Sequence, residues 1–188
     1  MQDPDFLSSC IDVSVAFWVG IVDGVSQNGS NVPRWMTEPP GVDPAGVSFG
    51  MVAFGDAAVP VLKLWTESVS SRCPLRTLRA RRADESALAV LHCWLAEARV
   101  GWRLMLAGSE VDVLVARSEV VAYGAVEAEI RIYVTSTDRK RVYCPQCRTV
   151  TEAVCVTGQR VACEGCGGSL RVDTHVSRRH GAYLGVCD

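Results

Sequence analysis

The sequence has no marked excess of charge and no long apolar run. Among its 188 residues, 19 are Lys or Arg and 21 are Asp or Glu, so the formal net charge is −2. This balance gives no general attraction to nucleic acid. The apolar run at residues 13–22 is too short to cross a bilayer, and no basic residue precedes Arg34 to begin a secretory signal. We therefore expect a cytoplasmic protein that binds neither a membrane nor nucleic acid.

Cysteine is plentiful, yet the pattern of a disulfide scaffold is missing. The chain has nine cysteines, four of them in two Cys-x-x-Cys pairs. The others are scattered along the sequence, at Cys10, Cys73, Cys93, Cys155 and Cys187. An odd number of scattered thiols indicates a reducing compartment, in which they stay free or buried.

The two cysteine pairs are the strongest signal in the sequence. They consist of Cys144 with Cys147 and of Cys163 with Cys166, and fifteen residues separate them. Four thiolates at this spacing are typical of a tetrahedral Zn²⁺ site. Gly167 follows the second pair, where a tight turn needs a residue that tolerates unusual backbone angles.

The metal is expected to be structural zinc. A segment of this size buries too little apolar surface to fold alone, so a metal supplies the missing stability. Four cysteine ligands also leave no open coordination position for catalysis. Rubredoxin-like iron is the alternative, because tetrahedral four-sulfur sites suit iron as well.

Strand and helix patterns alternate through the middle of the chain. Apolar or alternating segments predict strands at residues 47–54, 75–79, 102–107 and 129–134. Helical patterns lie between them, at residues 57–68, 84–99 and 109–123. Four strands joined by three helices indicate an α/β domain with a parallel sheet and with helices on both faces.

Capping residues support two of these helices. Asp56 is placed to cap the first helix, and Pro60 fits its first turn, where no backbone N–H partner is needed. Ser109 and Asp112 have the spacing of a capping box, although Asp replaces the usual Glu or Gln. Gly124 is placed to end the third helix.

Basic residues gather at the end of the second predicted strand, at Arg76, Arg79, Arg81 and Arg82. They form either a solvated strand end or a contact for an anion or an acidic partner. The first interpretation is favoured, because isolated surface charges usually contribute little. In the helix that follows, Trp94 lies on the apolar face and is expected to pack in the core.

The G-x-G-x-x-G fingerprint of dinucleotide-binding sheets is absent. Residues 55–60 (GDAAVP) instead resemble the Gly-Gly-x-Gly-x-Thr-Pro turn of the nicotinamide domain in ferredoxin-reductase-like proteins, and residues 107–110 (AGSE) resemble their Cys-Gly-Pro turn. Asp56 would place a negative charge against the phosphates at the start of the helix. We therefore expect a degenerate, reductase-like scaffold that does not bind NAD(P)H.

The sequence divides into three parts. Residues 1–46 are expected to form an irregular arm, because residues 26–46 are rich in Pro, Gly, Ser and Asn. Residues 47–136 form the α/β domain, and residues 137–188 form the zinc ribbon with a basic tail. Trp35 in the arm either anchors the chain to a partner or packs on its own domain.

The tail carries a specific pattern, H-x-S-R-R-x-x-A-Y-x-G, from His175 to Gly185. Preceded by a CPxC…CxxCG ribbon and an α/β domain, it resembles the small subunit of dimethylamine monooxygenase. This is the DmmA family, also described as heme-dependent oxidative N-demethylase. The resemblance is close over residues 130–186, architectural over residues 47–129 and absent over residues 1–46.

This resemblance implies membership of a complex that converts dimethylamine to methylamine and formaldehyde with O₂ and NADPH. Heme, FMN and an iron–sulfur cluster would reside in partners, namely a heme-binding catalytic subunit and a flavin and iron–sulfur reductase subunit. Tetrahydrofolate-dependent capture of formaldehyde would also belong to a partner. The present chain would then be an accessory subunit without catalytic residues of its own.

Four residues are candidates for docking such partners: Arg178, Arg179, Tyr183 and Trp35. Arg and Tyr often anchor interfaces, and guanidinium groups suit acidic surfaces. His175 and His180 are expected at the surface or core edge, because four cysteines already fill the metal site. Two other functions compete with the accessory subunit, a zinc-ribbon nucleic-acid-binding protein and a rubredoxin-like electron carrier.

Overall fold

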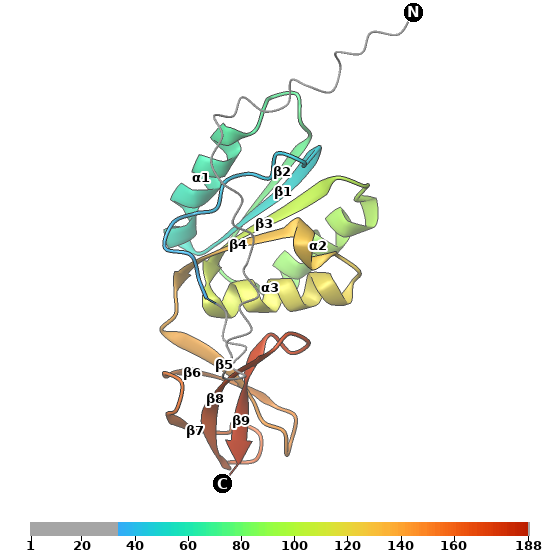
Figure 1. Cartoon of the computed structure of the whole chain (residues 1–188). Coiled ribbons are helices and arrows are strands. Elements are labelled where there is room, and N and C mark those ends of the chain that lie inside the picture. Colours follow the sequence, from blue (N-terminus) through green and yellow to red (C-terminus); the bar gives the residue numbers. More distant parts are fainter. Residues whose placement is uncertain (1–33, 188) are drawn as a thin grey trace, which may run out of the picture.

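The computed structural model describes residues 34–187 (Figure 1). The predicted arm therefore lies largely outside the described residues, as do the apolar run at residues 13–22 and Cys10. The first half of the described chain contains β1 (Ser48–Phe54), η2 (Asp56–Ala58), α1 (Val59–Ser68), β2 (Leu75–Ala80), α2 (Glu85–Glu97), β3 (Trp102–Ser109), α3 (Glu110–Ala122), η3 (Glu127–Glu129) and β4 (Ile130–Ser136). The second half contains β5 (Arg139–Tyr143), β6 (Val150–Val154), β7 (Arg160–Ala162), β8 (Ser169–Ser177) and β9 (Ala182–Cys187).

Strands β1 to β4 form the predicted parallel sheet, in the order β2-β1-β3-β4. Helix α1 packs on one face, where Trp65 and Leu62 contact Met51 and Met105. Helices α2 and α3 pack on the other face, where Leu91, Trp94 and Val113 join Val52 and Leu106 (Figure 1). The prediction of an α/β domain with helices on both faces is confirmed, and Trp94 lies in the core.

The caps were predicted correctly for α3 but not for α1. Ser109 caps α3 by accepting a hydrogen bond from the Asp112 backbone N–H at 3.3 Å, and Gly124 follows the helix at φ 107°. At the first helix the chain makes a 3₁₀ turn, η2, whose cap is Gly55 at φ 76° with no side-chain bond. Asp56 is therefore not an N-cap, whereas Pro60 does lie in the first turn of α1.

The remaining strands form a separate five-stranded sheet in the order β6-β5-β9-β8-β7. It is mostly antiparallel, with one parallel pairing between β5 and β9. Its small core contains the first cysteine of each pair, packed with four other buried side chains: Val142, Leu170, Val172 and Tyr183. The helix α3 contributes Leu114 to this same core, so the second sheet lies against α3 (Figure 1).

The segment 34–46 has no helix or strand, and its Val42 packs on the core between α1 and the parallel sheet. The Trp65 indole donates a hydrogen bond to the Pro40 carbonyl at 2.8 Å. Buried Asp43 accepts a bond at 2.7 Å from Arg103 of β3. The described part of the predicted arm is thus irregular in backbone but fixed by side-chain contacts. Among the described residues, no helix combines the length and apolarity needed to cross a membrane.

Candidate metal centre

Two similar loops carry the four cysteines. Cys144 and Cys147 lie between β5 and β6, and Cys163 and Cys166 lie between β7 and β8. In each loop the first cysteine carbonyl accepts a bond from the residue after the second cysteine, at 2.8 Å in the first loop and 2.9 Å in the second. That residue is left-handed in both loops, with Gly167 at φ 72°, as the sequence predicted. The two loops therefore present their thiols from matching turns.

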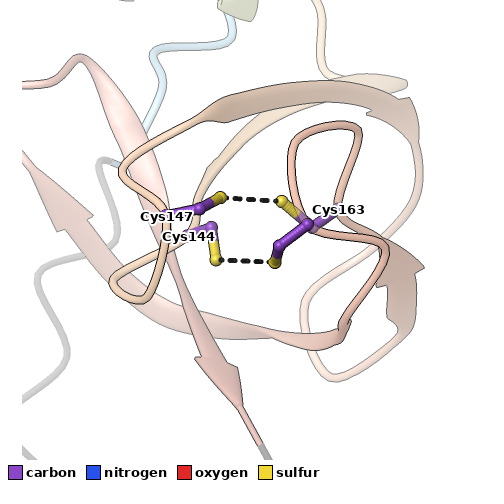
Figure 2. Close-up of side chains that lie close together, drawn as sticks. Cys144, Cys147 and Cys163 are labelled. Carbon is purple, nitrogen blue, oxygen red and sulfur yellow. Dashed lines mark hydrogen bonds between the residues drawn. The ribbon is translucent and has the colours of Figure 1, made fainter.

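The four sulfur atoms converge between these loops (Figure 2). All of them lie within 4.8 Å of one another. Cys147 Sγ is 3.4 Å from Cys163 Sγ, and Cys144 Sγ is 3.9 Å from Cys166 Sγ. A tetrahedral Zn–S₄ site with bonds of ~2.3 Å has sulfur atoms ~3.8 Å apart, so these four thiols fit such a metal without a large rearrangement.

Burial of the site is uneven. Cys144 and Cys163 are buried at 0% and 3% exposure, Cys147 is half-buried, and Cys166 is exposed. One side of the site therefore packs against the domain core, and the other faces solvent. Among the described residues, the only group of candidate ligand atoms this close together comes from these four cysteines.

Two of the four cysteines already favour the thiolate form in these loops. Hydrogen bonds from the Thr149 hydroxyl and backbone lower the pKa of Cys147 to about 6. Backbone N–H groups of Cys166 and Gly165 lower the pKa of Cys163. Although the Gly168 N–H favours the Cys166 thiolate, the neighbouring Cys147 and Cys163 raise the pKa of Cys166 to about 11. Crowding of like charges therefore leaves at least one proton in the site until a cation replaces it.

A buried carboxylate joins the two sheets. Glu110, 1% exposed, begins α3 directly after β3. Its two oxygens accept hydrogen bonds from Tyr183 Oη at 2.6 Å, Trp35 Nε1 at 2.8 Å and Lys140 Nζ at 2.8 Å. We call these four residues the domain junction. Burial and the adjacent Glu110 raise the pKa of Tyr183 well above its usual range, so its hydroxyl keeps the proton that it donates.

The domain junction contains two of the residues that were predicted to dock partners. Tyr183 is 1% exposed and bonded within the chain, so it presents no surface to a partner. Trp35 is half-buried and packs on both neighbouring cores, which is the own-domain alternative. Sequence reasoning missed Glu110 and Lys140. The available signal was an acidic residue, Glu110, placed directly between a buried strand and the helix that follows it.

The tail motif forms the β8–β9 hairpin, which lies on α3. Gly181 has φ 53°, and a Cβ there would meet the Leu114 carbonyl oxygen at 2.5 Å, so only glycine allows this approach. Arg178 is exposed and pairs with Glu127 at 3.1 Å, while Arg179 is exposed. His180 stacks on Tyr143 with ring centroids 4.1 Å apart. Most of the motif therefore holds the two sheets together.

One arginine of the predicted basic cluster also crosses between the domains. Arg82 pairs with Glu152 of β6 at 2.5 Å, and Arg139 of β5 pairs with the same carboxylate at 2.9 Å. Arg76 pairs with Glu97, whereas Arg79 and Arg81 are exposed. Through Arg82, the basic cluster thus contributes an ion pair that connects the two sheets.

These features define a protein in which a five-stranded sheet with four converging cysteines lies against helix α3 of a parallel α/β sheet. Residues 141–186 match the family model described as the C-terminal domain of the DmmA-like dimethylamine monooxygenase subunit. Over these residues the chain is similar to that family, and the resemblance inferred from its motifs is confirmed.

A curated relative extends the match. The heme-dependent oxidative N-demethylase delta subunit of Ectopseudomonas mendocina (strain ymp) is 38% identical over 98 residues. The alignment covers 52% of this chain and 55% of the relative, so the chain spans about half the relative's length. No solved structure matches, and the likeness to ferredoxin-reductase-like proteins stays a prediction.

Proposed function

We propose that this chain is an accessory, metal-stapled subunit of a multicomponent oxidative N-demethylase. The observation that carries the proposal is the DmmA-like domain with its converging cysteines, together with the similarity to a delta subunit of such an enzyme. The reaction proposed for the complex is oxidation of dimethylamine to methylamine and formaldehyde, with O₂ and NADPH. Catalysis belongs to a heme-binding partner, and electrons come from a partner with flavin and an iron–sulfur cluster.

The geometry supports a non-catalytic role in two ways. Four cysteine ligands fill a tetrahedral metal and leave no position for substrate. In parallel sheets, nucleotides bind beyond the carboxyl ends of the strands, where the strand order reverses. Here that point lies between β1 and β3, and Glu110 with its three donors occupies the end of β3. The Glu110 carboxylate already takes up these donors, so they are not available to a pyrophosphate at this position.

Zinc is the metal that we propose for the site. Two similar loops with four thiolates are the usual structural Zn²⁺ arrangement, and Cys144, Cys147, Cys163 and Cys166 would hold it. The bound cation would fix β5, β7 and β8 to one another. Elemental analysis of the purified chain tests this, with one zinc per chain as the expected result.

A direct experiment tests the accessory role. The chain is co-expressed with its heme-binding and flavin partners, and NADPH consumption on dimethylamine is measured with and without it. We expect activity only from the assembled complex and none from the chain alone. Assembly without this chain at full activity, or turnover by the single chain, would refute the proposal.

The tail arginines supply one proposed contact with the partners. Arg179 is exposed, and the neighbouring Arg178 is exposed and pairs with Glu127. Arg179→Glu should weaken assembly with an acidic partner surface more than Arg179→Lys, which keeps the charge. Both variants should retain the metal, because neither residue is among its ligands.

A rubredoxin-like electron carrier is the second candidate. The exposure of Cys166 favours it, because a solvent-facing ligand gives electrons a short path from a four-sulfur iron. Such iron absorbs visible light, whereas d¹⁰ zinc does not, so the colour of the protein separates the two. Nucleic-acid binding is tested by salt titration, in which phosphate contacts would give a steep slope.

A further inference from the structure

A fifth thiol lies beside the four converging cysteines. Cys187 is the last residue of β9, and it pairs across the sheet with Leu170 of β8. Leu170 is buried in the same core as Cys144 and Cys163. Because directly paired residues of antiparallel strands point to the same face of a sheet, Cys187 lies on the face that packs against two of the candidate ligands.

The alternation of side chains along β9 gives the same placement. Tyr183, Gly185 and Cys187 are two residues apart and share one face of the strand. Tyr183 is buried in the core of the second sheet, and a Cβ at Gly185 would meet the Tyr143 carbonyl oxygen at 2.9 Å. Tyr143 directly precedes Cys144. This face of β9 therefore lies close to the end of β5, where the first cysteine loop begins.

The Cys187 thiol interacts with three of the four candidate ligands. Desolvation, the charge of Cys144 and a hydrogen bond with its thiol raise the pKa of Cys187, and Cys163 and Cys147 act in the same direction. Cys155, a buried thiol of the same core, lies instead near the ammonium and the carboxylate of the domain junction. Of these two further thiols, Cys187 is the one placed against the ligand cluster.

Cys166 is the ligand that this fifth thiol is placed to replace. Cys144 and Cys163 are buried and Cys147 is half-buried, whereas Cys166 is exposed. A thiolate at the surface is the first that oxidants and alkylating reagents reach. If Cys166 is lost, the three ligands that remain are the same three with which Cys187 interacts. A tetrahedral metal then has one open position, and a thiol beside it can fill that position.

We propose that Cys187 is a reserve ligand, which completes the metal site with Cys144, Cys147 and Cys163 when Cys166 is lost. The Cys187 thiol gives its proton to water, and its sulfur takes the fourth position, so four thiolates are restored. In the described chain Cys187 forms the last pair between β8 and β9, so its side chain can turn without breaking a further pair. This inference rests on the metal proposed above and adds a fifth residue to its site.

The number of sulfur atoms around bound zinc tests the proposal. X-ray absorption separates Zn–S bonds of ~2.3 Å from Zn–O bonds of ~2.0–2.2 Å. We expect four sulfur atoms in the original chain and four in full-length Cys166→Ser, but at most three when Cys187→Ser is added. The zinc affinity of that double variant should be about tenfold below that of Cys166→Ser. Cys166→Ser with Cys93→Ser is the matched control, because Cys93 is an exposed thiol of α2, and it should keep four.

Zinc release provides a second measurement, in a chain that keeps all four original ligands. Cys187→Ser should lose zinc to a competing chelator about threefold faster than the original chain, because a ligand that detaches then has no replacement. Cys93→Ser should release zinc at the original rate. The fold is not at risk in either variant, since both thiols are exposed.

The outcomes separate the reserve ligand from the proposed metal. If the original chain holds no zinc, both proposals fail. If the original chain holds zinc through four sulfur atoms but Cys166→Ser holds it through three, or takes up none, the metal stands and the reserve ligand is overturned. Four sulfur atoms in the double variant, or equal zinc release from Cys187→Ser and the original chain, would overturn it as well.

Discussion

Arg148 and Gly167 occupy the same position in the two cysteine loops. Both follow the second cysteine, and both are left-handed, with φ 64° for Arg148 and 72° for Gly167. Among the described residues, Arg148 is the single non-glycine residue with positive φ. A side chain costs ~1–2 kcal/mol in this conformation, so one loop is strained and the other is not.

This asymmetry gives the first prediction. Arg148→Gly should raise the free energy of unfolding by about 0.5–1 kcal/mol, because relief of strain exceeds the added freedom of the unfolded chain. Gly167→Ala is the matched control, since no atom lies within 4 Å of the added Cβ and only the backbone conformation opposes it. It should lower stability by ~1 kcal/mol. Denaturant melts measure both, and a destabilised Arg148→Gly variant would contradict the argument.

The second prediction concerns the domain junction. Glu110→Gln should lower the free energy of unfolding by about 2–4 kcal/mol, because it leaves the buried Lys140 ammonium without its carboxylate. Tyr183→Phe should cost less, ~1–2 kcal/mol, since it removes the hydrogen bond to Glu110 and a long one from Lys140 but leaves the ion pair intact. Glu85→Gln, at the exposed first turn of α2, should change little. Equal stability of Glu110→Gln and Glu85→Gln in a thermal melt would refute the role assigned to Glu110.

At the scale of elements, we expect the second sheet and the proposed metal to depend on each other. The core of the second sheet is small, and it includes Cys144 and Cys163 themselves. A domain of this kind draws its stability from metal coordination rather than from buried area. The helix α3 connects the second sheet to the parallel sheet, because Leu114 of this helix lies in the core of the second sheet while Val113 lies in the core of the first.

The third prediction follows from that dependence. Cys163→Ser should release the metal and unfold residues 139–187, while the parallel sheet keeps its own two cores. Cys93→Ser, at an exposed cysteine of α2, is the control and should keep one metal per chain. Hydrogen exchange and limited proteolysis would locate the unfolded part. A Cys163→Ser variant that retains metal and protects β8 would rule out the proposed ligand set.

The fourth prediction is a proton count. At pH 7.5 Cys166 holds its proton in the metal-free site, because its pKa is raised to about 11, whereas Cys147, lowered to about 6, is already a thiolate. Zinc binding should therefore release at least one proton, and more as the pH falls toward 6 and Cys147 becomes protonated. Metal affinity should decrease as the pH is lowered, because protons then compete with the metal for the thiolates. Calorimetry in buffers of different ionisation enthalpy measures this, and a heat independent of buffer would contradict it.

At the scale of the molecule, the second sheet closes the end of the first where a nucleotide would bind. The domain junction and the Arg82–Glu152 pair both cross this end. Together with the missing glycine fingerprint, this leads to the fifth prediction, that the intact chain does not bind NADPH. Isothermal calorimetry should show no heat beyond dilution. Saturable binding in the micromolar range would mean that the domain keeps a nucleotide site.

Several features could be read from the sequence because they depend on local chemistry. The strand and helix order follows from hydrophobic periodicity, and the Ser109 cap and Gly124 stop follow from their side chains and backbone freedom. The convergence of the four cysteines could be predicted because two Cys-x-x-Cys loops fix the spacing of their own thiols. The prediction of an Asp56 cap was wrong because a 3₁₀ turn over Asp56–Ala58, capped by Gly55, precedes the helix.

The remaining features depend on contacts between distant parts of the chain. Tyr183 and Trp35 look like interface anchors in sequence, and only the packing of the β8–β9 hairpin on α3 shows that they bind Glu110 instead. Likewise, the pairing of Lys140 with Glu110 joins residues that no local pattern connects. The sequence by itself determined the elements and the metal loops, because those are specified by neighbouring residues. The tertiary structure decided which polar side chains face one another across the junction, since burial forces each of them to find a partner there.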